Sequence, residues 1–113
     1  MTLYFINAQI IDPEARTVTR GTLKVEGTQI AAILPEDVPI PGDAHIVDCL
    51  GKYLAPGIVD LGVKVCEPGE RHKESFRSAG LAAAAGGVTT MVTRPDTTPA
   101  IDSPEVLEFV TRR

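Results

Sequence analysis

Residues 54–75 are LAPGIVDLGVKVCEPGERHKES, and this stretch decides the fold of the second half of the chain. After Pro56 and Gly57 the apolar residues continue almost without interruption to Val65. Such a run is typical of a strand in a parallel sheet, which is covered on both faces. We therefore predict a buried strand that delivers the side chains at its end into a site.

A helix is predicted directly after this strand. In residues 72–87, HKESFRSAGLAAAAGG, four residues share one face at helical spacing: Phe76, Ala79, Gly80 and Ala83. The two glycines at 86 and 87 supply a C-terminal stop. The small side chains of this face predict close packing against a sheet.

The same order of elements is then repeated. Residues 88–93, VTTMVT, are rich in β-branched side chains and predict a second strand. A turn-rich segment leads to a helix opening near residue 102, where Asp102 and Glu105 fit a capping box and Pro104 lies in the first turn. Two right-handed βα units in the class α/β are either the opening quarter of a (β/α)₈ barrel or part of an open doubly wound sheet.

The sequence before this stretch follows a different pattern, in which short apolar runs alternate with turn residues. That pattern is typical of antiparallel strands, which we expect at residues 3–6, 9–11, 22–26, 29–34 and 45–47. Gly27 and Thr28 predict a two-residue hairpin loop, because glycine supplies the positive φ that such a loop needs. The change of pattern near Tyr53 predicts two domains, a small β-rich domain at residues 1–53 and a βαβα segment at residues 54–113.

Composition and charge exclude several classes of partner. The chain has 113 residues and a net charge of -4, and it contains no run of Lys and Arg that would suit nucleic acid or an anionic membrane. It has no apolar stretch near the roughly 20 residues of a membrane span, and its start lacks the features of a signal peptide. A cytoplasmic location is therefore expected, and Cys49 and Cys66, which lack CxxC spacing, are expected to be reduced.

These motifs resemble the dihydroorotase branch of the amidohydrolase superfamily. Its members have an APG motif, then H-x-H and EPG along the strand, an Ala-rich helix ending in AAGG-x-TT, and the motif MPNT-x-P. The match covers almost the whole chain, including the β-rich N-terminal part. The resemblance implies the opening βα units of a (β/α)₈ amidohydrolase barrel, incomplete in this chain and preceded by a small β-sandwich-like domain. It also implies pyrimidine biosynthesis and, for the family, zinc.

The departures from the family motifs are concentrated at the positions that touch metal or substrate. The two metal-binding histidines of the family fall on Gly62 and Lys64, and its substrate-carboxylate arginine falls on Cys66. In MPNT-x-P the substrate-contacting asparagine falls on Asp96, and the methionine falls on Arg94. The structural motif positions are kept: Pro56, Gly57, Asp60, Glu67, Pro68, Gly69, Gly86, Gly87, Thr89, Thr90 and Pro95.

The replacements are incompatible with the metal chemistry of the family. A strand with a period of two sends residues 60, 62 and 64 to one side, so an H-x-H pair there would chelate one metal ion. Glycine has no ligand atom, and the ammonium group of lysine repels a dication. We therefore predict that the motif keeps the fold and has lost the reaction, with no catalytic residue, no metal ligand and no cofactor.

Other side chains near this strand admit two interpretations each. His72 suits a metal ligand by its place after the strand, but a polar residue at a helix start is favoured, and for His45 a structural role is favoured. Lys64, facing the interior, needs a counter-charge, and Asp60 is the nearest candidate by spacing. Lys64 itself then replaces the positive charge of the metal.

Cys66 is a candidate nucleophile only if a base or a positive neighbour makes its thiol a thiolate, and no such partner is evident. Three glutamates, Glu67, Glu70 and Glu74, are candidate acid/base groups. They are better explained as acidic residues near a helix start, where the macrodipole and water favour them.

Two functions from different classes remain. The first is a non-catalytic dihydroorotase-like subunit, a pseudoenzyme that serves as a structural partner of aspartate carbamoyltransferase. The second is an active cyclic amidohydrolase whose metal site is rebuilt from residues outside this segment. Because two βα units cannot close a barrel, we also expect the chain to self-associate as an oligomer or to be covered by a partner.

Overall fold

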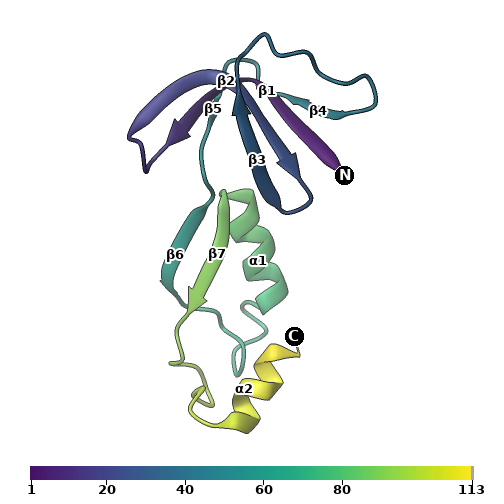
Figure 1. Ribbon diagram of the computed structural model, residues 1–113. Helices are drawn as coiled ribbons and strands as arrows, with labels where there is room; N and C mark the ends of the chain where they lie inside the picture. The colour runs from purple at the N-terminus through teal and green to yellow at the C-terminus, as the bar shows by residue number, and fades with distance from the viewer. Residues whose placement is uncertain (113) are drawn as a thin grey trace. The chain divides into compact units, whose positions relative to one another are not determined.

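The structure is a computed structural model that describes residues 1–112. The chain divides into two compact units, Met1–Pro56 and Gly57–Arg113. The first unit contains only strands, β1 to β5, and the second contains β6, α1, β7 and α2 in this order (Figure 1). The observed order is the predicted one, a β-rich part followed by strand, helix, strand and helix. None of the helices within residues 1–112 is long and apolar enough to cross a membrane.

The first unit is built on one five-stranded sheet. Its strands are β1 (Thr2–Asp12), β2 (Thr17–Glu26), β3 (Gln29–Leu34), β4 (His45–Asp48) and β5 (Tyr53–Leu54). Their order is β3-β2-β1-β4, and β5 also pairs with β1. The predicted hairpin at Gly27 and Thr28 is confirmed, with Gly27 at a φ of 60° between β2 and β3. The predicted strand at residues 22–26 is longer than expected, since β2 begins at Thr17.

The expectation that the predicted strands are all antiparallel is wrong for β4, and it also does not describe β5, a short strand that was not predicted. Both run parallel to β1, with Leu3 opposite His45 and Gln9 opposite Tyr53. The reason is the connector at residues 35–44, which carries the chain back across the sheet and starts β4 in the same direction as β1. A tight turn would instead have produced an antiparallel neighbour.

Strand β1 contains both of the short strands predicted at residues 3–6 and 9–11, separated by an irregularity rather than by a turn. The pairing of β1 with β2 shifts register between Phe5 and Ala8, and Asn7 has a φ of 54°. The carbonyl of Asn7 accepts from the Gly51 amide at 2.7 Å. The bulge therefore turns backbone acceptors toward the turn that links β4 to β5.

Asp48 fixes the other side of this turn. One of its carboxylate oxygens accepts from Asn7 Nδ2 and from the Leu50 amide, each at 2.9 Å. The hydrogen bond from Asn7 and then that from Leu50 lower the pKa of the Asp48 carboxyl below its ordinary value. A carboxyl with a lowered folded-state pKa stabilises the fold above its unfolded-state pKa, and this contribution is lost as the pH falls through the folded-state value.

We therefore expect the acid limb of the stability curve to depend on Asp48. In urea unfolding below about pH 4, the ordinary range of an aspartate, the midpoint of the unmodified protein should fall more steeply with pH than that of Asp48→Asn. The amide can still accept the same hydrogen bonds but cannot titrate. Asp37→Asn, on the exposed connector, is the control and should keep the unmodified slope. Equal slopes for Asp48→Asn and the unmodified protein would contradict the assignment.

The second unit has a two-stranded parallel sheet and two helices. Its elements are β6 (Ile58–Val63), α1 (Phe76–Ala85), β7 (Val88–Thr93) and α2 (Pro104–Thr111). Helix α1 packs against β7 (Figure 1). The predicted face of α1 is confirmed, since Ala79 is buried and Phe76, Gly80 and Ala83 are half-buried, whereas Leu81 is exposed.

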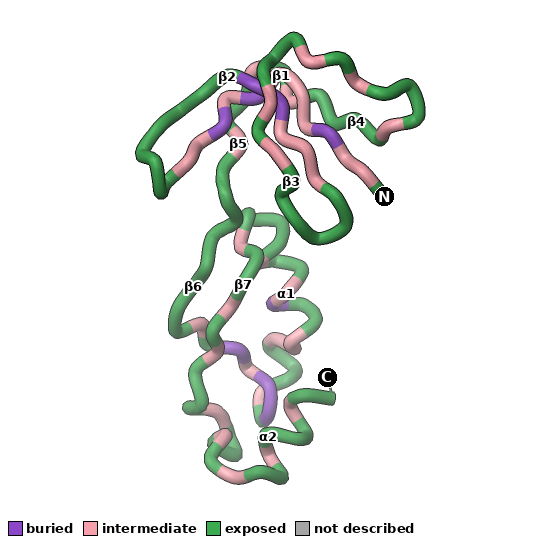
Figure 2. The backbone as a smooth tube through the Cα atoms, viewed as in Figure 1, coloured by how far each residue is buried: buried purple, intermediate pink, exposed green. Residues whose placement is uncertain are grey.

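The prediction that the first strand of this unit is buried on both faces is wrong for the described residues. Leu61 is 76% exposed, and in β6 only Val63 is even half-buried. The physical reason is that β6 belongs to a sheet of two strands, which leaves most of its apolar surface uncovered. Burial in this unit is instead strongest in the loop after β6, at Val65, Glu67 and Pro68 (Figure 2).

The capping box predicted at Asp102 and Glu105 is also wrong. Helix α2 has Ser103 as its N-cap, with extended backbone and a hydroxyl that accepts from the Val106 amide at 3.4 Å. Pro104 follows as the first helical residue, where its missing N–H costs no hydrogen bond. Asp102 and Ser103 are adjacent and both suit an N-cap. The fixed φ of Pro104 suits the first helical position, so Ser103, the residue before it, is the N-cap.

Candidate functional site

The candidate site lies where β6 and β7 end. Because the two strands are parallel, the residues that follow them meet at the same edge of the sheet. The Arg94 amide donates to the Val63 carbonyl at 2.9 Å, which fixes the start of one loop beside the end of the other. The structure therefore brings together four of the sequence-predicted positions, Gly62, Lys64, Arg94 and Asp96, at neighbouring strand ends.

Gly62 interrupts the strand rather than continuing it. The β6–β7 register shifts between Leu61 and Val63, and Gly62 has a φ of 88°. The prediction that residues 60, 62 and 64 share one side is therefore wrong. A left-handed residue breaks the alternation of side chains, and Lys64 already lies beyond the end of the strand. A side chain other than glycine at this position would be strained.

Arg94 extends across this glycine. An ideal Cβ on Gly62 would lie 4.0 Å from both Cγ and Cδ of Arg94, which is ordinary van der Waals contact. The guanidinium donates to Asp96 Oδ2 at 2.8 Å, and both side chains are exposed. Asp96 is therefore held in an ion pair with its neighbour.

Lys64 is exposed and does not form the predicted ion pair with Asp60 in the described part of the chain. The strand ends before Lys64, so the spacing on which that pair depended does not hold. Its charge acts on Glu70 instead. The pKa of the Glu70 carboxyl is lowered chiefly by its hydrogen bond and charge interaction with Lys73, and also by Lys64 and His72.

The cysteines and histidines do not gather at this edge as a ligand set. Cys49, in the first unit, and Cys66, in the second unit, are half-buried and free. His72 is exposed in the turns before Ser75, the N-cap of α1, and His45 is exposed at the start of β4. Within residues 1–112, no group of three or more His, Cys, Asp or Glu side chains is placed to hold a metal ion.

A divalent cation does not fit the residues at the strand ends. Gly62 offers no ligand atom, and Lys64 and Arg94 contribute cationic side chains at this edge, which repel a dication. Asp96 follows β7 at this edge and has a carboxylate, but this carboxylate already accepts a hydrogen bond from Arg94. The arrangement is suited to internal charge pairing and not to metal coordination.

Glu67 has a structural role, in agreement with its place among the kept motif positions. The other explanation, an acidic residue that water favours near a helix start, is wrong for Glu67, because this residue is only 2% exposed. Its carboxylate accepts from the Phe76 amide at 3.0 Å at the first turn of α1 and lies 3.4 Å from Nε of Arg71. A second signal was its place between Cys66 and Pro68, in a tight segment before the helix.

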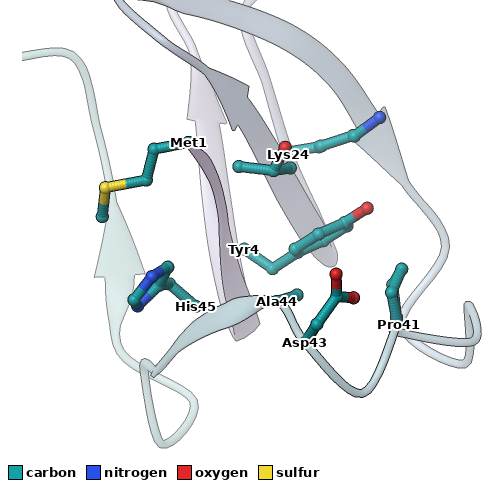
Figure 3. Close-up of a pocket in the computed structure, with 8 residues that line it drawn as sticks. Met1, Tyr4, Lys24, Pro41, Asp43, Ala44 and His45 are labelled. Carbon is teal, nitrogen blue, oxygen red and sulfur yellow. The ribbon is translucent and has the colours of Figure 1, made fainter.

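A hollow of about 550 Å³ in the first unit is lined by residues of β1, β2 and β4 and by the end of the connector (Figure 3). Tyr4 is buried on its floor, and Asp43 and His45 stand at its sides. The amino group of Lys24 forms an ion pair with Glu26 and points away from the other lining side chains. The hollow therefore does not assemble a catalytic set.

The family model described as dihydro-orotase-like matches residues 51–113, which is more than half of the chain. The chain belongs to the dihydro-orotase-like family. Its match begins at the turn before β5 and includes every replaced motif position. The predicted resemblance is therefore confirmed at the level of the family.

Curated relatives of this dihydro-orotase-like chain are similar along almost its whole length. A dihydroorotase of Wolbachia sp. subsp. Brugia malayi is 42% identical over 113 residues, which cover 96% of this chain and 25% of the relative. A dihydroorotase of Ehrlichia chaffeensis is 38% identical over 117 residues, covering 100% of this chain and 26% of the relative. The chain thus spans about a quarter of the length of these relatives.

Solved structures confirm the fold class. A D-hydantoinase matches with a TM-score of 0.80 and 26% identity, over 99% of this chain and 24% of that one. The L-hydantoinase of Arthrobacter aurescens matches with a TM-score of 0.82 and 24% identity, over 95% of this chain and 24% of that one. The dihydro-orotase-like chain therefore has the fold of the N-terminal part of an amidohydrolase.

Proposed function

We propose that this chain is part of a cytoplasmic dihydroorotase-like protein of pyrimidine biosynthesis that does not catalyse ring opening. In this proposal it acts as a structural partner of aspartate carbamoyltransferase. The family membership supports the pathway, and the strand ends support the loss of catalysis. The partner is proposed because a chain that keeps the fold of its family and lacks its chemistry retains the surfaces needed for assembly.

A single observation carries the proposal. At the carboxyl ends of β6 and β7, a left-handed glycine, a lysine and an arginine–aspartate ion pair occupy the positions where the family motif has its metal and substrate contacts. These residues provide positive charge and no free donor set for a cation. The loops around them keep residues on which the fold depends, including Glu67, which is buried, and Gly69, where an added Cβ would overlap Thr98.

An active cyclic amidohydrolase is the second candidate. The dihydroorotases that match this chain at 42% and 38% identity are about four times as long, which favours a reading in which residues outside this segment complete a site. That enzyme would need a metal site rebuilt without residues 62 and 64. It would also need a substrate contact other than those of the motif at Cys66 and Asp96.

Zinc content and ring opening of dihydroorotate distinguish the two candidates. We expect the full-length protein to which this chain belongs to contain no stoichiometric zinc and to show no turnover, and Lys64→His in that protein to restore neither. Each single reversion leaves the other contacts missing, so the effects are strongly non-additive. The dihydroorotase of Ehrlichia chaffeensis, assayed in parallel, is the positive control. Stoichiometric zinc with turnover in the unmodified protein would favour the second candidate.

The assembly part of the proposal rests on uncovered apolar surface. Val59, Leu61 and Leu81 are all more than half exposed, and β6 has one unpaired edge in the described sheet. We expect light scattering at micromolar concentration to show self-association of the chain alone. In sedimentation with aspartate carbamoyltransferase we expect a new, larger species. A monomer that sediments independently of the transcarbamoylase would contradict both expectations.

A further inference from the structure

We infer that Arg94, held by Asp96, is the residue that closes this edge of the sheet to divalent cations, and that its effect is separate from the missing histidines. The inference deepens the proposed loss of catalysis, on which it rests, by naming the side chain that excludes the metal. It predicts that ligands restored at positions 62 and 64 remain ineffective while Arg94 is present.

The first step of the argument is the position of the Arg94 side chain. Its Cγ and Cδ each lie 4.0 Å from the position that the Cβ of a side chain at residue 62 would take. A longer side chain at position 62, such as histidine, would extend from this point into the space beside the arginine stem. The path of a restored ligand is thus already bordered by a cationic side chain.

The second step is that the arginine is fixed in place and permanently charged. Its amide donates to the Val63 carbonyl at 2.9 Å, and its guanidinium donates to Asp96 at 2.8 Å. The guanidinium carries a positive charge, which repels a dication. The carboxylate of Asp96 is engaged in the same pair and is therefore not free to bind a metal ion.

The third step is the backbone of Gly62. Gly62 has a φ of 88°, and the strand register shifts beside it, so the backbone leaves the regular path of the strand at this residue. The close passage of the Arg94 stem and the left-handed glycine belong to one local arrangement. The effect of a substitution at position 62 therefore depends on the residue at position 94, and the two positions are coupled.

Zinc titration of variants by calorimetry tests the inference. The background is the double variant Gly62→His with Lys64→His, purified free of metal, and the comparison is the addition of Arg94→Met, which removes the charge and keeps the length. Removing one unit charge beside a bound dication at an exposed edge should tighten zinc binding by about tenfold. Arg20→Met, on β2 in the first unit, is the charge-matched control and should leave zinc binding unchanged.

The inference is overturned if Arg94→Met leaves zinc affinity unchanged, or if Arg20→Met tightens it equally. Should the histidine at the left-handed position 62 prevent folding, Lys64→His with and without Arg94→Met gives the same comparison, followed by NMR during zinc addition. Turnover by the unmodified protein would refute the proposed function, whereas these comparisons concern the variants alone, so the two failures are distinguishable.

Discussion

Alanine in place of Gly69 is expected to destabilise the second unit strongly. An added Cβ would lie 2.1 Å from the carbonyl oxygen of Thr98, and Gly69 has a φ of 105°, where an L side chain is strained. Backbone strain and steric overlap together should lower the free energy of unfolding by about 4 kcal/mol. That is a large part of the roughly 5 to 15 kcal/mol by which a domain is stable.

The measurement is urea unfolding followed by circular dichroism, with Gly80→Ala as the matched control. Gly80 lies inside α1, and no heavy atom is within 4 Å of the Cβ that would be added. This control should raise the free energy of unfolding by about 0.5 to 1 kcal/mol, because alanine loses less conformational entropy in a helix than glycine. If both variants unfold at the same urea concentration as the unmodified protein, the close approach of the two loops is not as described.

Removal of the Glu67 carboxylate should have the next largest effect. Its acceptor satisfies the Phe76 amide at the start of α1, and the buried side chain lies beside the exposed Arg71. Glu67→Ala leaves a part-buried amide without that acceptor. We expect the free energy of unfolding to fall by about 2 to 3 kcal/mol. Glu67→Gln keeps an acceptor of similar shape and should lose about 1 kcal/mol.

Hydrogen exchange gives a second, local readout of the same variants. The amides of the first turn of α1 should exchange faster in Glu67→Ala than in Glu67→Gln, since only the first loses the acceptor. Glu70→Gln, which alters an exposed pair with Lys73, is the control and should leave both exchange and the unfolding midpoint unchanged. Equal protection of the Phe76 amide in all three variants would contradict the role given to Glu67.

Local patterns predicted local structure well. The hairpin at Gly27 and Thr28 depends on residues that are adjacent in sequence, and the buried face of α1 depends on a spacing of three and four. Both were predictable because few alternatives satisfy the same geometry. The start of α2 was missed by one residue, since Asp102 and Ser103 are both good N-caps and only the neighbouring proline distinguishes them.

Features that depend on distant contacts were not predictable in this way. The parallel pairing of β4 and β5 with β1 joins residues about 40 positions apart and leaves no mark in the pattern of either strand. Gly62 was interpreted only as a missing ligand, whereas its positive φ also changes the direction of the loop that carries Lys64. Glutamate is usually exposed to solvent, so the residue type alone predicts an exposed side chain at position 67, whereas Glu67 is buried.

The parallel pairing of β4 and β5 with β1 has a consequence for synthesis on the ribosome. Strands β1 to β3 can associate as soon as they emerge, because their partners are neighbours in sequence. The other edge of β1 stays unpaired until the strands that contain His45 and Tyr53 have been synthesised. At about 5 to 20 residues per second, the nascent chain carries that unpaired edge for roughly 2 to 8 s. During this interval a chaperone, or the same edge on a neighbouring nascent chain, can compete for β1.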